Sequence, residues 1–267
     1  MDNRPIGVFD SGYGGITSVK ALLKLLPDEN IVFFGDNGRA PYGTRSEAEL
    51  RHFVKQNIAF LDKFNIKALV VSCGTASSVG REIIENVDYP STGVIAPAVE
   101  KLVRLGTGGK PVGIIATGAC VSNGLYEKII GERLPGTKTV SVACTDFVPL
   151  VESGRCSKDD PAVADACRRY LEPIKAAGAG SIILGCTHYG LLSDAIADYL
   201  GTEVVQIEAS ACAAESMAEY LSENGMLGSG GRREYFTSGS TADFNRNATV
   251  FLEGTDTVNS KYASADV

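Results

Sequence analysis

The sequence predicts an α/β protein with two pseudo-symmetric, doubly wound parallel-sheet domains. Short apolar segments alternate with helical patterns along its 267 residues, and this alternation is typical of parallel sheets. The chain also repeats itself: segment 5–12 has a partner at 111–118, and the apolar run that ends at Cys73 has a partner that ends at Cys186. The chain therefore divides into two related halves, each with one thiol at the same place.

The first half contains three expected strands separated by helices. Ser46 is the expected N-cap of the second helix, with Glu49 as its capping-box partner. In order, the expected elements are strand Ile6–Asp10, helix Ile16–Leu26, strand Ile31–Gly35, a polar turn over 36–43, a helix from 46 to about 64, and strand Leu69–Val71.

The second half repeats this scheme before a different tail begins. Strands are expected near 112–116, 138–142 and 181–185, and the tail adds a helix over 208–226, a strand over 235–238 and a closing segment over 247–253. Because the second half already has its own full set of elements, we expect the tail to fold back on the first half. The predicted domains are 1–96 plus 208–267, which carries Cys73, and 97–207, which carries Cys186.

The composition argues against several classes of protein. A net charge of −7 does not suit a general nucleic-acid binder, which needs a basic patch. No apolar stretch approaches the roughly 18 residues of a membrane span, and the first strand begins too early to leave room for a signal peptide. Seven cysteines without a Cys-x-x-Cys pair, and only two histidines, predict neither a disulfide framework nor a metal site. We expect a cytoplasmic protein without membrane or nucleic-acid partners.

The glycine-rich segment over 10–15 allows three interpretations. It follows a strand and opens a helix, as in a dinucleotide site, and Asp36 ends the second strand where a ribose-binding acid would lie. However, Thr17 occupies the third glycine position of the dinucleotide fingerprint. A phosphate-binding P-loop is also absent, because no Gly-Lys-Ser/Thr follows the glycines. A second interpretation is a tight turn in which glycine tolerates a positive φ. The third fits best: backbone N–H groups at the helix start bind a carboxylate.

Cys73 and Cys186 are the strongest candidates for chemistry. Both lie at the carboxyl ends of expected strands, as do Asp10 and Thr117, where ligands of open α/β sheets gather, so we expect them beside a cleft between the domains. A helix is expected to begin just after each cysteine, and a helix N-terminus lowers a thiol pKa toward neutrality. The other cysteines are expected to be inert core residues: Cys120, Cys144, Cys156, Cys167 and Cys212.

His188 is the better candidate of the two histidines for proton transfer, because it lies two residues after Cys186, whereas His52 lies on a polar helix face. Two similar proton-transfer groups on opposite faces of one carbon would serve a racemisation.

Several motifs together carry a resemblance to a known family. They are Asp-Ser-Gly-x-Gly-Gly from Asp10, Pro41-Tyr42-Gly43, Cys73 with Thr75, and Gly185-Cys186-Thr187-His188-Tyr189, supported by segments 147–152 and 235–239. This combination resembles glutamate racemase, of the aspartate/glutamate racemase superfamily. The resemblance implies two doubly wound domains with the site between them. It also implies a bacterial, cofactor-independent isomerase, active as a homodimer, that supplies D-glutamate for peptidoglycan synthesis and so for the cell wall and cell shape.

The resemblance implies a role for each matching residue. Cys73 would be the base for D-glutamate, assisted by Asp10. Cys186 would be the base for L-glutamate, assisted by His188 and its orienting partner Glu152. With no cofactor and no metal, placed bases and hydrogen-bond donors would lower the barrier to α-proton removal. The residues expected to hold the substrate are Asp10, Ser11, Tyr42, Gly43, Gly74, Thr75, Thr117, Thr187 and His188.

One position departs from the family pattern, which usually reads Cys-Asn-Thr where this chain has Cys73-Gly74-Thr75. A hydrogen bond lost to a charged substrate group costs roughly 1.5–3 kcal/mol, or about one to two decades in kcat/KM. Reduced activity, compensation by Ser72 or Ser78, and a shifted substrate all remain open. Three functions follow: a glutamate racemase, which we favour; a racemase of aspartate or another acidic amino acid; and a weakened, non-catalytic binder of acidic amino acids. Retention of both cysteines argues against the last.

Overall fold

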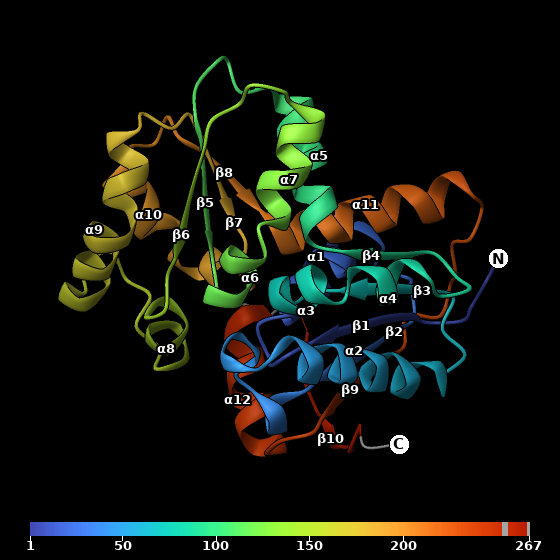
Figure 1. Ribbon diagram of the computed structural model, residues 1–267. Coiled ribbons are helices and arrows are strands. Elements are labelled where there is room, and N and C mark those ends of the chain that lie inside the picture. Colours follow the sequence, from blue (N-terminus) through green and yellow to red (C-terminus); the bar gives the residue numbers. More distant parts are fainter. Residues whose placement is uncertain (253–255, 266–267) are drawn as a thin grey trace. The chain divides into compact units, whose positions relative to one another are not determined.

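The computed structural model describes residues 1–252 and 256–265. The chain divides into two compact units: Met1–Val94 with Ser210–Val267 form the first unit, and Ile95–Ala209 form the second. Each unit is built on one sheet whose strands all pair in parallel (Figure 1). The predicted class, two parallel-sheet α/β domains, is confirmed. Within the described residues, no helix is both long enough and apolar enough to cross a membrane.

The sheet of the first unit has six strands in the order β10-β9-β2-β1-β3-β4. Its central strand β1 is fully buried, and Val8 lies between Phe33 of β2 and Val70 of β3. In the tail, β9 pairs with β2 and so extends the sheet of the first half. The strand bounds are β1 Ile6–Asp10, β2 Ile31–Gly35, β3 Ala68–Val71, β4 Ser91–Gly93, β9 Arg233–Thr237 and β10 Lys261–Tyr262.

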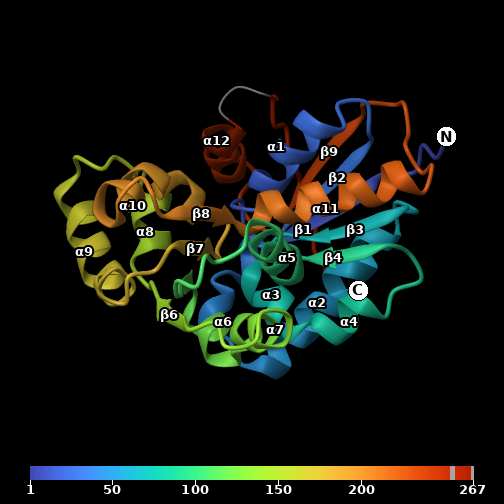
Figure 2. The same cartoon turned by 90° about the horizontal axis from the view of Figure 1, so that it is seen from above.

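Helices cover both faces of this sheet. Figure 2 shows α1 and α12 on one side and α2, α3 and α4 on the other. The capping box predicted at the start of α2 is present: Ser46 accepts from the backbone N–H of Glu49, whose carboxylate accepts from the backbone N–H of Ser46. The bounds are α1 Ile16–Leu25, α2 Glu47–Asp62, α3 Gly74–Val79, α4 Arg81–Glu85, α11 Ala209–Glu223 and α12 Thr241–Leu252.

The second unit has a four-stranded sheet in the order β6-β5-β7-β8. Figure 1 shows α5 and α7 together on one side of it and α9 and α10 together on the other. The strands are β5 Val112–Ala116, β6 Thr139–Ala143, β7 Ser181–Leu184 and β8 Val205–Glu208. The helices are α5 Ile95–Leu105, α6 Gly118–Asn123, α7 Leu125–Arg133, α8 Phe147–Glu152, α9 Pro161–Ala176 and α10 Ser193–Leu200.

The two sheets have the same strand order once the tail strands are set aside. In the first, β2-β1-β3-β4 are neighbours, and in the second β6-β5-β7-β8 are neighbours. Val8 therefore corresponds to Ile114, which lies between Ser141 and Ile183. The internal repeat seen in the sequence is a repeat of topology, and Cys73 and Cys186 follow equivalent strands.

Three strands were not predicted: β4, β8 and β10. Each has two to four residues and lies at a sheet edge, so it lacks the apolar run by which the central strands were recognised. The predicted helix over 208–226 takes up the last residue of β8, and the observed helix is Ala209–Glu223. The closing segment predicted over 247–253 belongs to α12, which begins at Thr241; residue 253 lies outside the described residues.

Candidate active site

In the first unit, Cys73 lies at the carboxyl end of β3 and caps the helix that follows. Its Sγ accepts a hydrogen bond from the backbone N–H of Ala76 at 3.4 Å, and its S–H donates to Ser11 Oγ at 3.5 Å. The small residues of α3, including Gly74 and Thr75, are all buried and allow this tight turn. The predicted helix start after Cys73 is confirmed.

Asp10 ends β1 and is buried. Its Oδ2 accepts from the backbone N–H of Gly15 at 2.8 Å, so the chain's own carboxylate occupies this donor at the start of α1. Gly15 has a φ of −63°, and a Cβ there would lie 2.4 Å from Asp10 Cβ. Gly15 is therefore required by close approach to Asp10 and not by a positive φ.

The loop after β2 carries Tyr42 and Gly43 in a short 3-10 helix, Tyr42–Thr44. The Tyr42 side chain is buried; its hydroxyl donates to Asp36 and accepts from Asn57 Nδ2 at 3.0 Å. Burial, then the charge of Asp36, raises the pKa of Tyr42 well above its ordinary value, so this phenol stays protonated. The two bonds turn the Tyr42 hydroxyl toward the interior of the unit.

Ser72 and Ser78, which could replace a lost side chain at position 74, are both engaged within the first unit. Ser72 Oγ bonds to Ser18 Oγ and the Gly15 carbonyl, and Ser78 Oγ donates to the Thr75 carbonyl at 2.9 Å. These bonds argue against compensation for Gly74 by either hydroxyl.

In the second unit, Cys186 follows β7 but does not cap an α-helix. A turn over Cys186, Thr187 and His188 leads into a 3-10 helix, Tyr189–Leu192, and α10 begins only at Ser193. The prediction of a helix start just after Cys186, with His188 in it, is therefore wrong. A Cβ at Gly190 would lie 2.5 Å from Glu208 Oε1, which is the end of a flexible side chain that can move aside, so this contact alone does not require glycine.

His188 connects Cys186 to a carboxylate. Its Nδ1 lies 3.8 Å from Cys186 Sγ and 3.3 Å from Thr187 Oγ1, and its Nε2 lies 3.2 Å from Glu152 Oε1. The imidazole is 8% exposed and the Glu152 side chain is 42% exposed, while Cys186 is partly buried, so the buried imidazole lies between two groups that solvent reaches. A thiol, an imidazole and a carboxylate in series can move a proton and hold the ring in one orientation.

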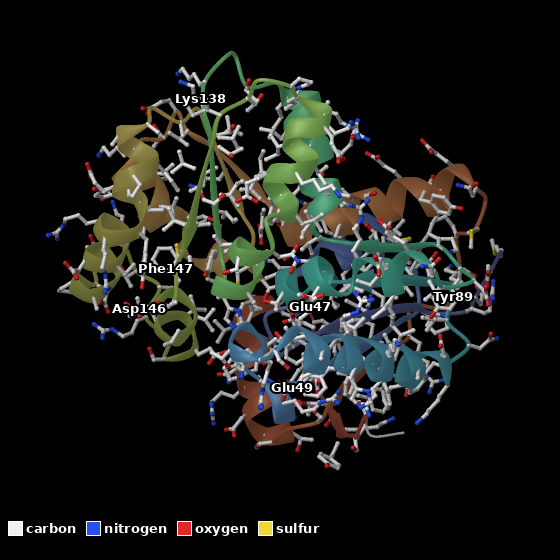
Figure 3. The ribbon with its side chains drawn as sticks, viewed as in Figure 1. Glu47, Glu49, Tyr89, Lys138, Asp146 and Phe147 are labelled. Atoms are coloured by element: carbon white, nitrogen blue, oxygen red, sulfur yellow. The ribbon has the colours of Figure 1, made fainter. Side chains whose placement is uncertain are left out.

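The six-residue helix α8 and Tyr189 support this arrangement. Tyr189 is fully buried, its hydroxyl donates to the Cys144 carbonyl at 2.9 Å, and its ring meets Phe147 edge-on at 5.2 Å between centroids. Figure 3 labels Phe147 and Asp146 where α8 begins, and Glu152 is its last residue. One short helix therefore supplies both the packing partner of Tyr189 and the carboxylate partner of His188.

The predicted site residues divide into two sets, each at the carboxyl ends of neighbouring strands. Thr117 follows β5, which pairs with β7, so it lies on the strand next to the one that leads to Cys186. The first unit holds Asp10, Ser11, Tyr42, Gly43, Cys73, Gly74 and Thr75, and the second holds Thr117, Glu152, Cys186, Thr187 and His188.

Four of the five remaining cysteines are buried, as predicted, and all seven are present as thiols. Burial raises the pKa of Cys144, and burial followed by the charge of Asp198 raises that of Cys167 to about 11, which suits inert thiols. The prediction is wrong for Cys156, which is only half-buried. Across residues 1–252 and 256–265, no group of His, Cys, Asp and Glu could hold a metal ion.

Sequence reasoning missed a group of polar residues behind Tyr42: Asp36, Arg39, Asn57 and Ser238. Asp36 was considered only as a ribose-binding acid, but its carboxylate is buried under Arg39, Tyr42 and Ser238. The spacing of Asp36, Arg39 and Tyr42, three residues apart in a polar turn, was the available signal.

Comparison with known proteins places this geometry in context. The model of the Asp/Glu/hydantoin racemase family matches residues 17–216. A glutamate racemase of Streptococcus equi subsp. equi is 36% identical over 263 residues, which cover 96% of this chain and 97% of the relative. One from Streptococcus agalactiae is 41% identical over 212 residues, 79% of each chain. The crystal structure of a Francisella tularensis glutamate racemase in complex with D-glutamate superposes with a TM-score of 0.91 at 33% identity, covering 100% of this chain and 99% of that one.

Proposed function

The chain belongs to the Asp/Glu/hydantoin racemase family, and from this we propose that it is a glutamate racemase that interconverts L- and D-glutamate without a cofactor. The observation that carries the proposal is the pair of thiols, Cys73 and Cys186, which follow equivalent strands of two topologically repeated sheets. Relatives matched over nearly their whole length are glutamate racemases.

In the proposed mechanism the two thiols act on opposite faces of the substrate's α carbon. One is a thiolate that takes the α-proton, and the other is a thiol that gives a proton to the opposite face. Cys73 is the base for D-glutamate and Cys186 is the base for L-glutamate. After one turnover the thiolate and the thiol have exchanged places, so the reverse reaction starts from the state that the forward reaction leaves.

Each thiol has its own assistance in this proposal. Asp10 assists Cys73 from the end of the neighbouring strand, and His188, oriented by Glu152, exchanges charge with Cys186. The substrate's carboxylates and amine are held by hydroxyl and backbone groups, which stabilise the charge that develops when the α-proton leaves. These groups belong to Ser11, Tyr42, Gly43, Gly74, Thr75, Thr117 and Thr187.

Further parts of the proposal follow from the family. The two units would be the racemase domains, 1–96 plus 208–267 and 97–207, and the enzyme would act as a cytoplasmic homodimer that supplies D-glutamate for peptidoglycan synthesis. The bacterial origin of the relatives supports this cellular role.

The proposal is tested by incubating the purified protein with L-glutamate in D₂O without added cofactor. Loss of optical rotation together with deuterium at the α carbon is the expected result. Gly74 stands where the family usually has asparagine, and this departure favours one competing function, the racemisation of aspartate. L-aspartate is therefore tested in parallel. Faster racemisation of aspartate than of glutamate would favour the related activity, and binding of either amino acid without exchange would indicate a non-catalytic binder.

A further inference from the structure

The carboxylate of Asp36 is the centre of a buried hydrogen-bond network behind Tyr42. Asp36 is fully buried and accepts from Arg39 Nε at 2.8 Å, from Ser238 Oγ at 2.7 Å and from the Tyr42 hydroxyl. Three donors on one buried carboxylate, one of them a guanidinium, compensate for its removal from water.

A second layer closes the network through α2. Arg39 Nη2 donates to Asn57 Oδ1 at 2.8 Å, while Asn57 Nδ2 donates to the Tyr42 hydroxyl at 3.0 Å. The guanidinium also lies over the Phe53 ring, 4.2 Å from its centroid. The network therefore joins three segments that are distant in the sequence: the loop over 36–44, helix α2 and the tail just after β9.

The same network adjoins the end of β1, where Asp10 and Ser11 lie. The backbone N–H of Asp36 donates to the Asp10 carbonyl at 3.0 Å, and the backbone N–H of Gly38 donates to Ser238 Oγ at 2.9 Å. Gly43 comes directly after Tyr42, so fixing the Tyr42 side chain also fixes the backbone of Gly43.

We propose that Asp36, Arg39 and Asn57 are positioning residues that hold the backbone of Tyr42 and Gly43 in place for substrate binding. In this proposal the Tyr42 hydroxyl bonds only within the unit and does not contact the substrate. The inference rests on the proposed function, because Gly43 matters only if glutamate binds there. A backbone N–H that is already held in place binds a carboxylate without the entropy cost of ordering the loop first. Loosening the loop over 36–44 should therefore weaken substrate binding more than it slows the proton transfers.

Tyr42→Phe is the main test, with Tyr89→Phe as a matched control. Each substitution removes one phenol that donates to an aspartate within the first unit, Asp36 for Tyr42 and Asp62 for Tyr89. Figure 3 labels Tyr89 well away from Glu47 and Glu49, which begin α2. For Tyr42→Phe we expect KM for glutamate to rise about tenfold with kcat changed less than about threefold, and for Tyr89→Phe neither constant should move.

Two results would overturn the proposal. If neither KM nor kcat changes in Tyr42→Phe, the network stabilises the fold alone. A fall of about a hundredfold in kcat at unchanged KM would place the hydroxyl in the chemistry itself.

Hydrogen exchange of backbone amides over 37–45 supplies a readout independent of activity. Asp36→Asn keeps the side-chain volume but removes the charge, and it should speed exchange across 37–45 by at least about tenfold relative to parent and Tyr89→Phe. Equal protection in Asp36→Asn and the parent would overturn the positioning role. If the parent protein racemises no glutamate, the proposed function fails, whereas the exchange result still decides whether Asp36 fixes the loop.

Discussion

The surroundings of Cys73 and Cys186 differ although the two residues follow equivalent strands. Cys73 caps α3 and has a backbone N–H and the Ser11 hydroxyl as partners. Cys186 precedes a non-helical turn and has the imidazole of His188, which contacts the Glu152 carboxylate. The repeated topology has thus placed the two thiols alike, while the local sequence gives Cys73 a backbone donor and a hydroxyl as partners and gives Cys186 a titratable side chain. Equivalent position does not require equivalent activation.

The largest expected effect comes from removing either thiol. Cys73→Ala and Cys186→Ala should each lower kcat for racemisation by at least about a thousandfold, because each substitution removes the proton-transfer group from one face of the α carbon and racemisation needs both. Kinetics with both enantiomers and circular dichroism for the fold would measure this. Cys156→Ala is the control, since that half-buried thiol lies outside both sets of site residues. Near-normal turnover in either alanine variant would rule out the two-thiol mechanism.

Replacing His188 should break the symmetry between the two directions. We expect His188→Asn to lower kcat by about 10²–10³-fold, the range of a general acid–base group. The equilibrium constant between enantiomers is one, so kcat/KM must fall equally in both directions. The asymmetry should instead appear as a larger isotope effect with α-deuterated L-glutamate than with the D-enantiomer. His52→Asn, on an exposed position of α2, is the control, and equal isotope effects would show that His188 does not serve Cys186 alone.

A smaller loss is expected for Glu152→Gln. The glutamine oxygen can still accept from His188 Nε2, and the half-exposed carboxylate is screened by water, so only the charge contribution is lost. We expect a fall in kcat of about threefold to tenfold, because an ion pair with a half-exposed carboxylate contributes only about 1 kcal/mol. A loss as large as that of His188→Asn would show that Glu152 takes part in the proton transfer itself.

The smallest effect is expected at Gly74, beside Cys73. Gly74 is the first residue of α3, and it is not among the glycines with positive φ, so the backbone accepts asparagine. If an amide next to the substrate matters, Gly74→Asn should raise kcat/KM for L-glutamate by a few-fold, which is less than the one to two decades that a full hydrogen bond of roughly 1.5–3 kcal/mol would give. Thermal unfolding is the control for a shifted helix start. A gain confined to L-aspartate would promote the aspartate alternative.

The parts of the fold that the sequence predicted are those with strong local signals. Ile6–Asp10 and Ile31–Gly35 were predicted with their observed bounds because every residue is buried and flanked by turn residues. The capping box at Ser46 is also a local pattern. By contrast, Val205–Glu208 is a half-exposed edge strand that leads directly into a helix, so neither length nor hydrophobicity separated the two.

The site residues that could be predicted from the residue pattern are those that lie at the carboxyl ends of strands, such as Cys73 and Cys186. Nothing in the residue types of Cys186, Thr187 and His188 distinguishes the start of an α-helix from a turn that leads into a 3-10 helix. The Asp36 network had only a partial signal in the sequence. The spacing of Asp36, Arg39 and Tyr42 is local, but Asn57 and Ser238 reach the network from α2 and from the tail.

The pairing of β9 with β2 has a consequence for the order in which the two units can fold during synthesis. The second unit, Ile95–Ala209, is one continuous stretch of chain and is complete as soon as it has left the ribosome. The first unit must wait, because β2 gains its neighbour β9, and Asp36 its partner Ser238, only about 200 residues later. At roughly 5–20 residues per second this delay is on the order of 10–40 s. During that interval β2 is an unpaired sheet edge of the nascent chain, and such an edge can pair with other chains unless it is covered.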